Sequence, residues 1–135
     1  MSDAKIGKGL EILVLDDEKD ICFFLKEFFS RRGFNVRTAL TGEQAVKLVK
    51  KIKPDIAILD IYLYKGKMTG LDVLKFIKQS ELKCSCVMVT RADEKETIDQ
   101  AQKLGADDYL IKPLTLLNVE KALDKVVKKI RKRKE

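Results

Sequence analysis

Short apolar runs alternate five times with amphipathic segments along this 135-residue chain, and this alternation restricts the fold more than any other feature. Each run has the length of a strand, and each amphipathic segment is long enough for a helix. Strict alternation of strand and helix is typical of a parallel sheet with helices on both faces. We therefore predict an α/β fold, with a single doubly wound sheet of five parallel strands in the order 2-1-3-4-5 and five helices. The expected strands cover residues 11–16, 34–40, 55–60, 84–90 and 108–111.

The first and last amphipathic segments show helical periodicity most clearly. Spacing of i, i+3, i+4, i+7 and i+8 predicts one buried face in the first segment. Its members are Ile21, Phe24, Leu25, Phe28 and Phe29. The inward face predicted for the last helix consists of Leu116, Val119, Leu123, Val126, Val127 and Ile130.

Polar residues with N-cap character precede three of the expected helices. Thr41 with Gln44, and Asp93 with Glu96, have the spacing of a capping box, in which each partner satisfies a backbone N–H of the other. Thr115 is placed to cap the last helix. These positions predict where the second, fourth and fifth helices begin.

Composition restricts the class of protein further. The N-terminus lacks the apolar stretch of a signal peptide, and no apolar run is long enough to span a membrane, so we expect a cytoplasmic protein. The cysteines Cys22, Cys84 and Cys86 are odd in number, and the chain has no histidine. The odd number of cysteines argues against a disulfide framework, and the lack of histidine leaves a zinc site without its fourth ligand. We interpret the cysteines as small buried apolar residues rather than redox or metal-binding groups.

The positive charge is concentrated at the C-terminus. Residues 125–135 hold seven cations and one anion, so they contribute +6 of the net +7 and leave +1 for the rest. We divide the chain into an N-terminal extension (1–9), one domain (10–130) and a basic tail (131–135). A solvated helix end is the favoured interpretation of the tail. Binding to nucleic acid, an acidic partner or an anionic surface is the alternative, but no aromatic residues alternate with the cations, so we expect no nucleic-acid binding by this chain alone.

Acidic side chains mark the ends of two expected strands. Asp16 and Asp17 follow the first apolar run, and Asp60 ends the third. In the order 2-1-3-4-5 these strands are neighbours, and ligands of such sheets bind beyond the carboxyl ends at this point. Three carboxylates in close proximity repel one another unless a cation lies between them. Oxygen ligands favour Mg²⁺ or Mn²⁺, although Asp16 or Asp17 alone could equally cap the first helix.

The fourth and fifth strands end in residues that suit phosphate. Thr90 provides a hydroxyl, and Lys112 provides an ammonium group. A hydroxyl and a cation beside a metal-bound carboxylate indicate the handling of a phosphoryl group. A carboxylate can itself act as the nucleophile and form an aspartyl phosphate.

These residues lie in four motifs, "LVLDDE", "AILDIYL", "VMVTRAD" and "GADDYLIKPL", in this order along the chain. With them the sequence resembles the receiver domain of two-component response regulators, of the stand-alone chemotaxis type, over about residues 10 to 130. The resemblance implies a flavodoxin-like fold. It also implies a phosphorelay protein that accepts a phosphoryl group from a histidine kinase or phosphotransfer protein. Such a domain catalyses only its own phosphorylation and dephosphorylation, and it binds a downstream effector or belongs to a longer regulator.

The resemblance assigns the metal site residue by residue. Asp60 matches the phosphoacceptor. Asp17 matches the direct Mg²⁺ ligand, and Asp16 matches the acidic residue that acts largely through water. The backbone carbonyl of Tyr62 matches the third protein ligand.

The same resemblance assigns the phosphate contacts and the switch. Lys112 matches the phosphate-binding lysine, and its bond to Pro113 is often cis in the family. Thr90 matches the switch hydroxyl, and Tyr109 matches the switch aromatic. Phosphorylation is then expected to alter the face formed by the fourth helix, the fifth strand and the fifth helix.

The chain departs from the family pattern at the loop after Asp60 and at Arg91. Tyr64 stands where a proline is usual, and the loop is about two residues longer, with Lys65 and Lys67. Arg91 stands where a small residue is usual. It could attract phosphodonors, crowd the site or reshape the output face. These departures leave open an alternative, a degenerate receiver that acts as an unphosphorylated docking scaffold.

Two other functions on the same fold fit poorly. A flavin-binding site would need a Ser/Thr/Gly-rich phosphate loop after the first strand, where this chain has "DDEKD". A haloacid-type phosphatase would need an aspartate two residues after Asp60, where this chain has Tyr62.

Overall fold

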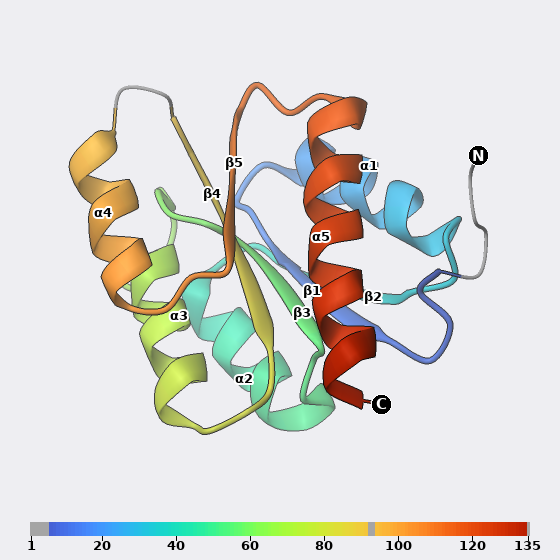
Figure 1. Ribbon diagram of the computed structural model, residues 1–135. Coiled ribbons are helices and arrows are strands. Elements are labelled where there is room, and N and C mark those ends of the chain that lie inside the picture. Colours follow the sequence, from blue (N-terminus) through green and yellow to red (C-terminus); the bar gives the residue numbers. More distant parts are fainter. Residues whose placement is uncertain (1–5, 92–93, 135) are drawn as a thin grey trace.

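The computed structural model describes residues 6–91 and 94–134, which form five strands and five helices in strict alternation (Figure 1). The strands are β1 (Glu11–Leu15), β2 (Asn35–Ala39), β3 (Ile56–Asp60), β4 (Ser85–Arg91) and β5 (Asp108–Lys112). The helices are α1 (Lys19–Ser30), α2 (Gly42–Ile52), α3 (Gly70–Gln79), α4 (Lys95–Lys103) and α5 (Leu116–Lys134). The predicted elements are confirmed, with ends displaced by one or two residues.

All five strands are parallel and lie in the predicted order, β2-β1-β3-β4-β5. The central strand β3 is buried along its whole length, because helices cover it on both faces. The edge strand β2 exposes three of its five residues. The order reverses between β1 and β3, whose carboxyl ends are adjacent through the pair Leu15 and Leu59.

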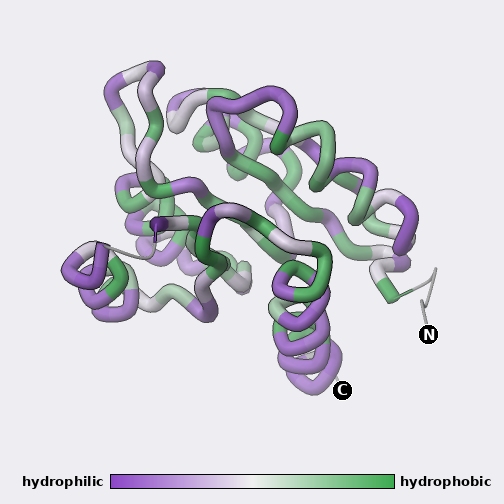
Figure 2. Tube along the Cα trace, turned by 90° about the horizontal axis from the view of Figure 1, so that it is seen from above, coloured by the Kyte–Doolittle hydropathy of each residue, from purple (hydrophilic) through white to green (hydrophobic). Residues whose placement is uncertain are grey.

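Two core clusters lie on opposite faces of the sheet. One is formed with side chains of α1 and α5, and the other with side chains of α2, α3 and α4. Figure 1 shows these helices on the two sides of the sheet, and Figure 2 shows apolar residues along the strands and hydrophilic residues on the outer turns of the helices. Cys22, Cys84 and Cys86 are free and buried in these clusters, as their interpretation as small apolar residues predicts.

Helix starts differ in part from the predicted caps. Thr41 Oγ1 accepts the N–H of Gln44, but the Gln44 side chain accepts the N–H of Leu40, so the expected capping box is incomplete. A complete box occurs instead at Thr69 and Asp72, where α3 begins. The capping box predicted from Asp93 falls outside the described residues. Thr115 caps α5 as predicted, by accepting the N–H of Asn118.

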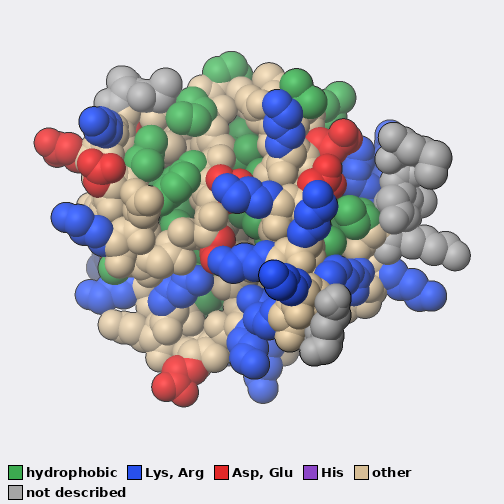
Figure 3. Space-filling view, in the orientation of Figure 1, with side chains coloured by type: hydrophobic (Ala, Val, Ile, Leu, Met, Phe, Trp, Pro, Cys, Tyr) green, Lys and Arg blue, Asp and Glu red, His purple; other side chains and the backbone are tan. Residues whose placement is uncertain are grey.

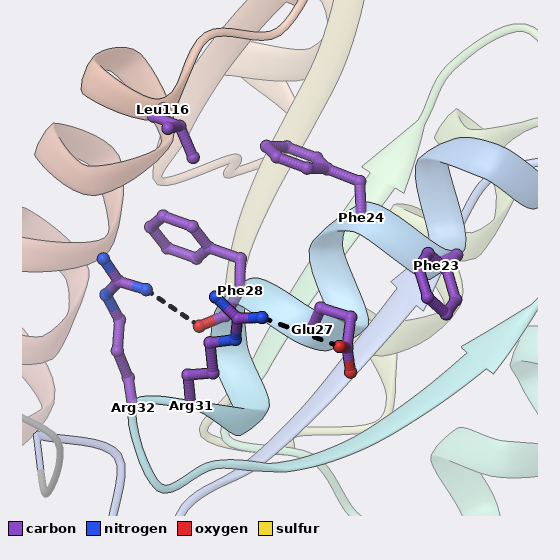
Figure 4. A pocket seen from close by; sticks show the side chains of 7 residues that line it. All are labelled: Phe23, Phe24, Glu27, Phe28, Arg31, Arg32 and Leu116. Carbon is purple, nitrogen blue, oxygen red and sulfur yellow. Dashed lines mark hydrogen bonds and ion pairs between the residues drawn. The ribbon is translucent and has the colours of Figure 1, made fainter.

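Helix α5 buries all but one of the six apolar residues predicted for its inner face. The exception is Leu116, which is 60% exposed, so that part of the prediction is wrong. Its turn lies beside α1 rather than over a strand, and Leu116 borders a hollow between the two helices (Figure 4). A helical face remains buried only where the sheet continues beneath it.

The C-terminal end of α5 is in contact with the rest of the chain. Arg131 donates to the carbonyl of Ile6, and Arg133 donates to the carbonyl of Lys83. Lysine and arginine side chains gather over this half of α5 in Figure 3. The boundary predicted at residue 130 lies inside the helix, and the separate tail stays a prediction. No helix in the described ranges is long and apolar enough to cross a membrane.

Candidate functional site

Three carboxylates meet at the carboxyl edge of the sheet. Asp16 follows β1 directly, Asp60 ends β3, and each of Asp16, Asp17 and Asp60 offers an oxygen within 4.8 Å of the others. Asp16 is 2% exposed and Asp60 is 4% exposed. The adjacency of β1 and β3 therefore brings together residues that are more than 40 positions apart, as the strand order predicts.

Lys112 reaches this cluster from the end of β5, across β4. Its Nζ lies 3.1 Å from Oδ2 of Asp60, 3.1 Å from Oδ2 of Asp16 and 3.0 Å from Oε2 of Glu18. The peptide bond between Lys112 and Pro113 is cis. Glu18 was not predicted as a site residue, although its acidic character directly after Asp16 and Asp17 was the available signal.

Burial and mutual repulsion alter the acidity of the cluster. Burial, with a further contribution from the charge of Asp16, raises the pKa of Asp60 to about 7, against the opposing effect of Lys112. Burial also raises the pKa of Asp16, although the N–H of Glu18 and the ammonium group of Lys112 oppose it. Burial lowers the pKa of Lys112, but Glu18, Asp60 and Asp16 outweigh this and raise it overall. The single positive charge of Lys112 thus does not fully neutralise the negative charge of the buried carboxylates.

The three carboxylates fit a hard divalent cation. Carboxylate oxygens are the ligands that Mg²⁺ and Mn²⁺ prefer, and the excess of negative charge favours a cation here. The alternative in which Asp16 or Asp17 caps the first helix is wrong, because the N-cap residue of α1 is Glu18 and no side chain within the described ranges caps this helix. Oδ1 of Asp16 instead accepts the N–H of Glu18 at 2.8 Å in the turn before α1, while Oδ2 faces Lys112.

The long loop after Asp60 is held at several points. The N–H of Tyr64 donates to Oδ2 of Asp17 at 2.7 Å, and the N–H of Lys67 donates to Oε2 of Glu43 at 2.9 Å. The N–H of Lys67 also lowers the pKa of Glu43. Glu43, on the first turn of α2, was not anticipated, because nothing in its local sequence indicates contact with a loop 24 residues away. The role of the Tyr62 carbonyl stays a prediction.

Thr90 lies at the same edge, and its hydroxyl is unused. Thr90 is 1% exposed, and Oγ1 has no hydrogen-bond partner among the described residues. A buried hydroxyl without a partner is costly unless a ligand engages it. Its position next to Asp60 across the β3–β4 pair makes it available to a group bound there.

Tyr109 lies on β5 with its ring against the core cluster of α2, α3 and α4. Burial raises the pKa of its phenol, and Asp108, Asp99 and Asp107 add to this effect. Its hydroxyl also lacks a partner among the described residues, and Tyr109 is not part of the cavity wall. Its switch role stays a prediction.

A cavity of about 210 Å³ opens above the carboxylates. Its wall consists of Asp17, Glu18, Asp60, Tyr62, Tyr64, Thr90, Arg91 and Lys112. Five predicted site residues therefore border one small polar cavity, namely Asp17, Asp60, Tyr62, Thr90 and Lys112. Asp16 is linked to this cavity by its ion pair with Lys112.

A wider hollow lies between α1 and the first turn of α5 (Figure 4). The guanidinium of Arg32 lies 3.6 Å from the centre of the Phe28 ring and donates to Glu120 of α5 at 3.1 Å. This hollow contains a single acidic side chain, Glu27, which pairs with Arg31. Of its charged residues, Arg32 joins the end of α1 to Glu120 of α5, and Glu27 pairs with Arg31 next to it, so the carboxylate cavity remains the candidate for chemistry.

The sequence is similar to those of known proteins over most of its length. The family model described as "Response regulator receiver domain" matches residues 12–124. The chain is 39% identical over 105 residues to the alkaline phosphatase synthesis transcriptional regulatory protein PhoP of Bacillus subtilis, covering 78% of this chain and 43% of PhoP. It is 31% identical over 121 residues to the chemotaxis protein CheY of Thermotoga maritima, covering 89% of this chain and 99% of CheY.

Solved structures show the same likeness. A two-component response regulator from Clostridium difficile has a TM-score of 0.81 and 31% identity, covering 90% of this chain and 98% of that one. By contrast, the chain spans about half the length of PhoP and of the probable C4-dicarboxylate response regulator DctR of Bacillus subtilis. The similarity therefore concerns one domain of those longer proteins.

Proposed function

The chain belongs to the receiver domain family of response regulators, and on this premise we propose that it accepts a phosphoryl group on Asp60. One observation carries the proposal: the carboxylate oxygens of Asp16, Asp17 and Asp60 lie within 4.8 Å of one another, with the Nζ of Lys112 3.1 Å from Asp60. The donor is the phosphohistidine of a partner kinase or phosphotransfer protein.

An oxygen of the ionised Asp60 attacks the phosphorus atom and forms a new P–O bond. The P–N bond to the donor histidine breaks, and its electron pair remains on the imidazole. Lys112 lies close enough to Asp60 to exchange part of its carboxylate contacts for the phosphoryl oxygens. Asp16, Asp17 and Asp60, with the carbonyl of Tyr62, would hold Mg²⁺ or Mn²⁺, which neutralises charge on the phosphoryl oxygens when bound. The domain turns over no external substrate.

Thr90 and Tyr109 form the proposed switch. The Thr90 hydroxyl, which has no partner among the described residues, is a donor for a phosphoryl oxygen. Movement of Thr90 leaves room for the Tyr109 ring behind it, and this biases the face formed by α4, β5 and α5 between two states. A downstream effector, or an output domain of a longer protein, is the proposed partner of that face.

Incubation with acetyl phosphate and Mg²⁺ followed by intact-mass measurement tests the proposal. We expect a gain of about 80 Da from one phosphoryl group. EDTA and Asp60→Asn should each abolish the gain, whereas Asp124→Asn, at an exposed position on α5, should leave it unchanged. An unmodified wild-type protein would refute the proposal and favour the docking scaffold.

A further inference from the structure

Arg91 and Tyr64 meet at the wall of the carboxylate cavity. Nη2 of Arg91 donates to the hydroxyl of Tyr64 at 2.8 Å, and both residues border the cavity. Arg91 ends β4, directly after Thr90, and it also borders the adjoining hollow near Phe24 and Pro113. Arg91 therefore borders both the carboxylate cavity and the hollow next to it.

Lys112, the other cation of the cavity wall, is already bound to carboxylates. An ammonium group has three N–H donors. Lys112 has three carboxylates within 3.1 Å, those of Asp16, Glu18 and Asp60. An anion that approaches Lys112 must compete with these partners.

Arg91 has donors to spare. A guanidinium carries five N–H donors in a planar fork that suits phosphate oxygens. Within residues 6–91 and 94–134, Arg91 makes one side-chain hydrogen bond, to a neutral hydroxyl, and forms no ion pair. It is also the only cation besides Lys112 in the wall formed by the described residues. An arriving phosphate thus meets a guanidinium that forms no ion pair with any part of the chain that the structure describes.

We propose that Arg91 is a phosphodonor-binding residue, which contacts the phosphate oxygens of the incoming donor at the wall of the cavity. This inference rests on the proposed function and names a contact of the same site. Tyr64 orients the guanidinium through its hydroxyl, while its backbone N–H binds Asp17. One residue of the longer loop thereby links the donor-binding cation to the acidic cluster.

The initial rate of phosphorylation as a function of acetyl phosphate concentration, at constant Mg²⁺, tests the inference. Arg91→Ala should raise the concentration for half-maximal rate by about tenfold and leave the maximal rate unchanged, because Asp60 and Lys112 are intact. Arg91→Lys keeps the positive charge but loses the planar guanidinium donors, and Tyr64→Phe loses the hydroxyl that orients Arg91. Each variant should therefore raise the half-maximal concentration by less than Arg91→Ala does. Arg37→Ala, an exposed arginine on the edge strand β2, is the matched control and should match the wild type.

The outcomes separate the two proposals. If the wild type is modified at Asp60 and Arg91→Ala has the same concentration dependence, the inference is wrong and the phosphoacceptor function stands. A faster reaction of Arg91→Ala would mean that the side chain obstructs the cavity, which also overturns the inference. An unmodified wild type would overturn both.

Discussion

The Nζ of Lys112 lies 3.1 Å from Oδ2 of Asp60, although 52 residues separate them in the sequence. The contact crosses β4, because β3 and β5 are not neighbours in the sheet. Lys112 opposes the rise in the pKa of Asp60 that burial and Asp16 cause. The balance between these effects determines the pH at which Asp60 becomes a nucleophile.

Asp60→Asn should remove a pH dependence of stability. The pKa of Asp60 is about 7 in the folded protein and close to its ordinary value of 3.8 in the unfolded chain. The folded state therefore binds the proton more tightly, and its stability falls as the pH rises from about 4 to about 7. With EDTA present, the wild type should lose about 3 kcal/mol relative to Asp60→Asn over this interval, as measured by urea unfolding. A difference that stays constant with pH would contradict the shift.

Thr90→Val should stabilise the unphosphorylated protein. The substitution removes a buried hydroxyl that lacks a partner among the described residues and keeps a similar shape. We expect the free energy of unfolding to increase by about 0.5–1 kcal/mol relative to Thr38→Val, a control at an exposed position of β2. Urea unfolding in EDTA measures both. A loss of stability would show that the hydroxyl is satisfied in the folded protein.

Arg32→Ala should destabilise the fold far more than Arg31→Ala, although the two arginines are adjacent. The guanidinium of Arg32 lies over the ring of Phe28 (Figure 4). It also binds Glu120, and the Arg32 side chain is only 17% exposed. The Arg31 side chain is 79% exposed and approaches Glu27 at 4.0 Å. The expected losses are about 1–2 kcal/mol for Arg32 and less than about 0.5 kcal/mol for Arg31, from denaturant midpoints. Equal losses would mean that the contact between α1 and α5 contributes nothing specific.

Glu43→Ala should loosen the loop after Asp60. Glu43 accepts the N–H of Lys67, and that loop also provides the Tyr64 N–H to Asp17. We expect faster amide exchange at Lys67 and a Mg²⁺ affinity about tenfold lower, as for residues that support metal ligands. Glu27→Ala, an exposed position on α1, is the control. Unchanged exchange at Lys67 would refute the anchoring role.

Periodicity and strand order were sufficient to predict the main chain and the acidic cluster. Asp16 and Asp60 end neighbouring strands, so their proximity follows from the topology alone. The burial of Val119 and Ile130 likewise follows from the helical spacing of the apolar residues in α5, which packs against the sheet. Both inferences depend on backbone geometry, which local sequence patterns determine strongly.

Contacts of long side chains could not be predicted in this way. Glu18 reaches Lys112, and Arg91 reaches Tyr64, through several rotatable bonds whose angles depend on surrounding packing. Gln44 has the spacing of a capping box but bonds to Leu40, because the backbone there offers a competing N–H. Leu116 has the correct helical phase but lies beside α1 instead of over a strand.

The position of the phosphoryl group is the most direct test of the central claim. Borohydride reduction of the protein after treatment with acetyl phosphate and Mg²⁺ converts a phosphorylated aspartate into homoserine, which peptide sequencing by mass spectrometry can locate. We predict homoserine at position 60 alone, only when Mg²⁺ was present. Homoserine at Asp16, Asp17 or any other aspartate, with Asp60 unmodified, would contradict the account.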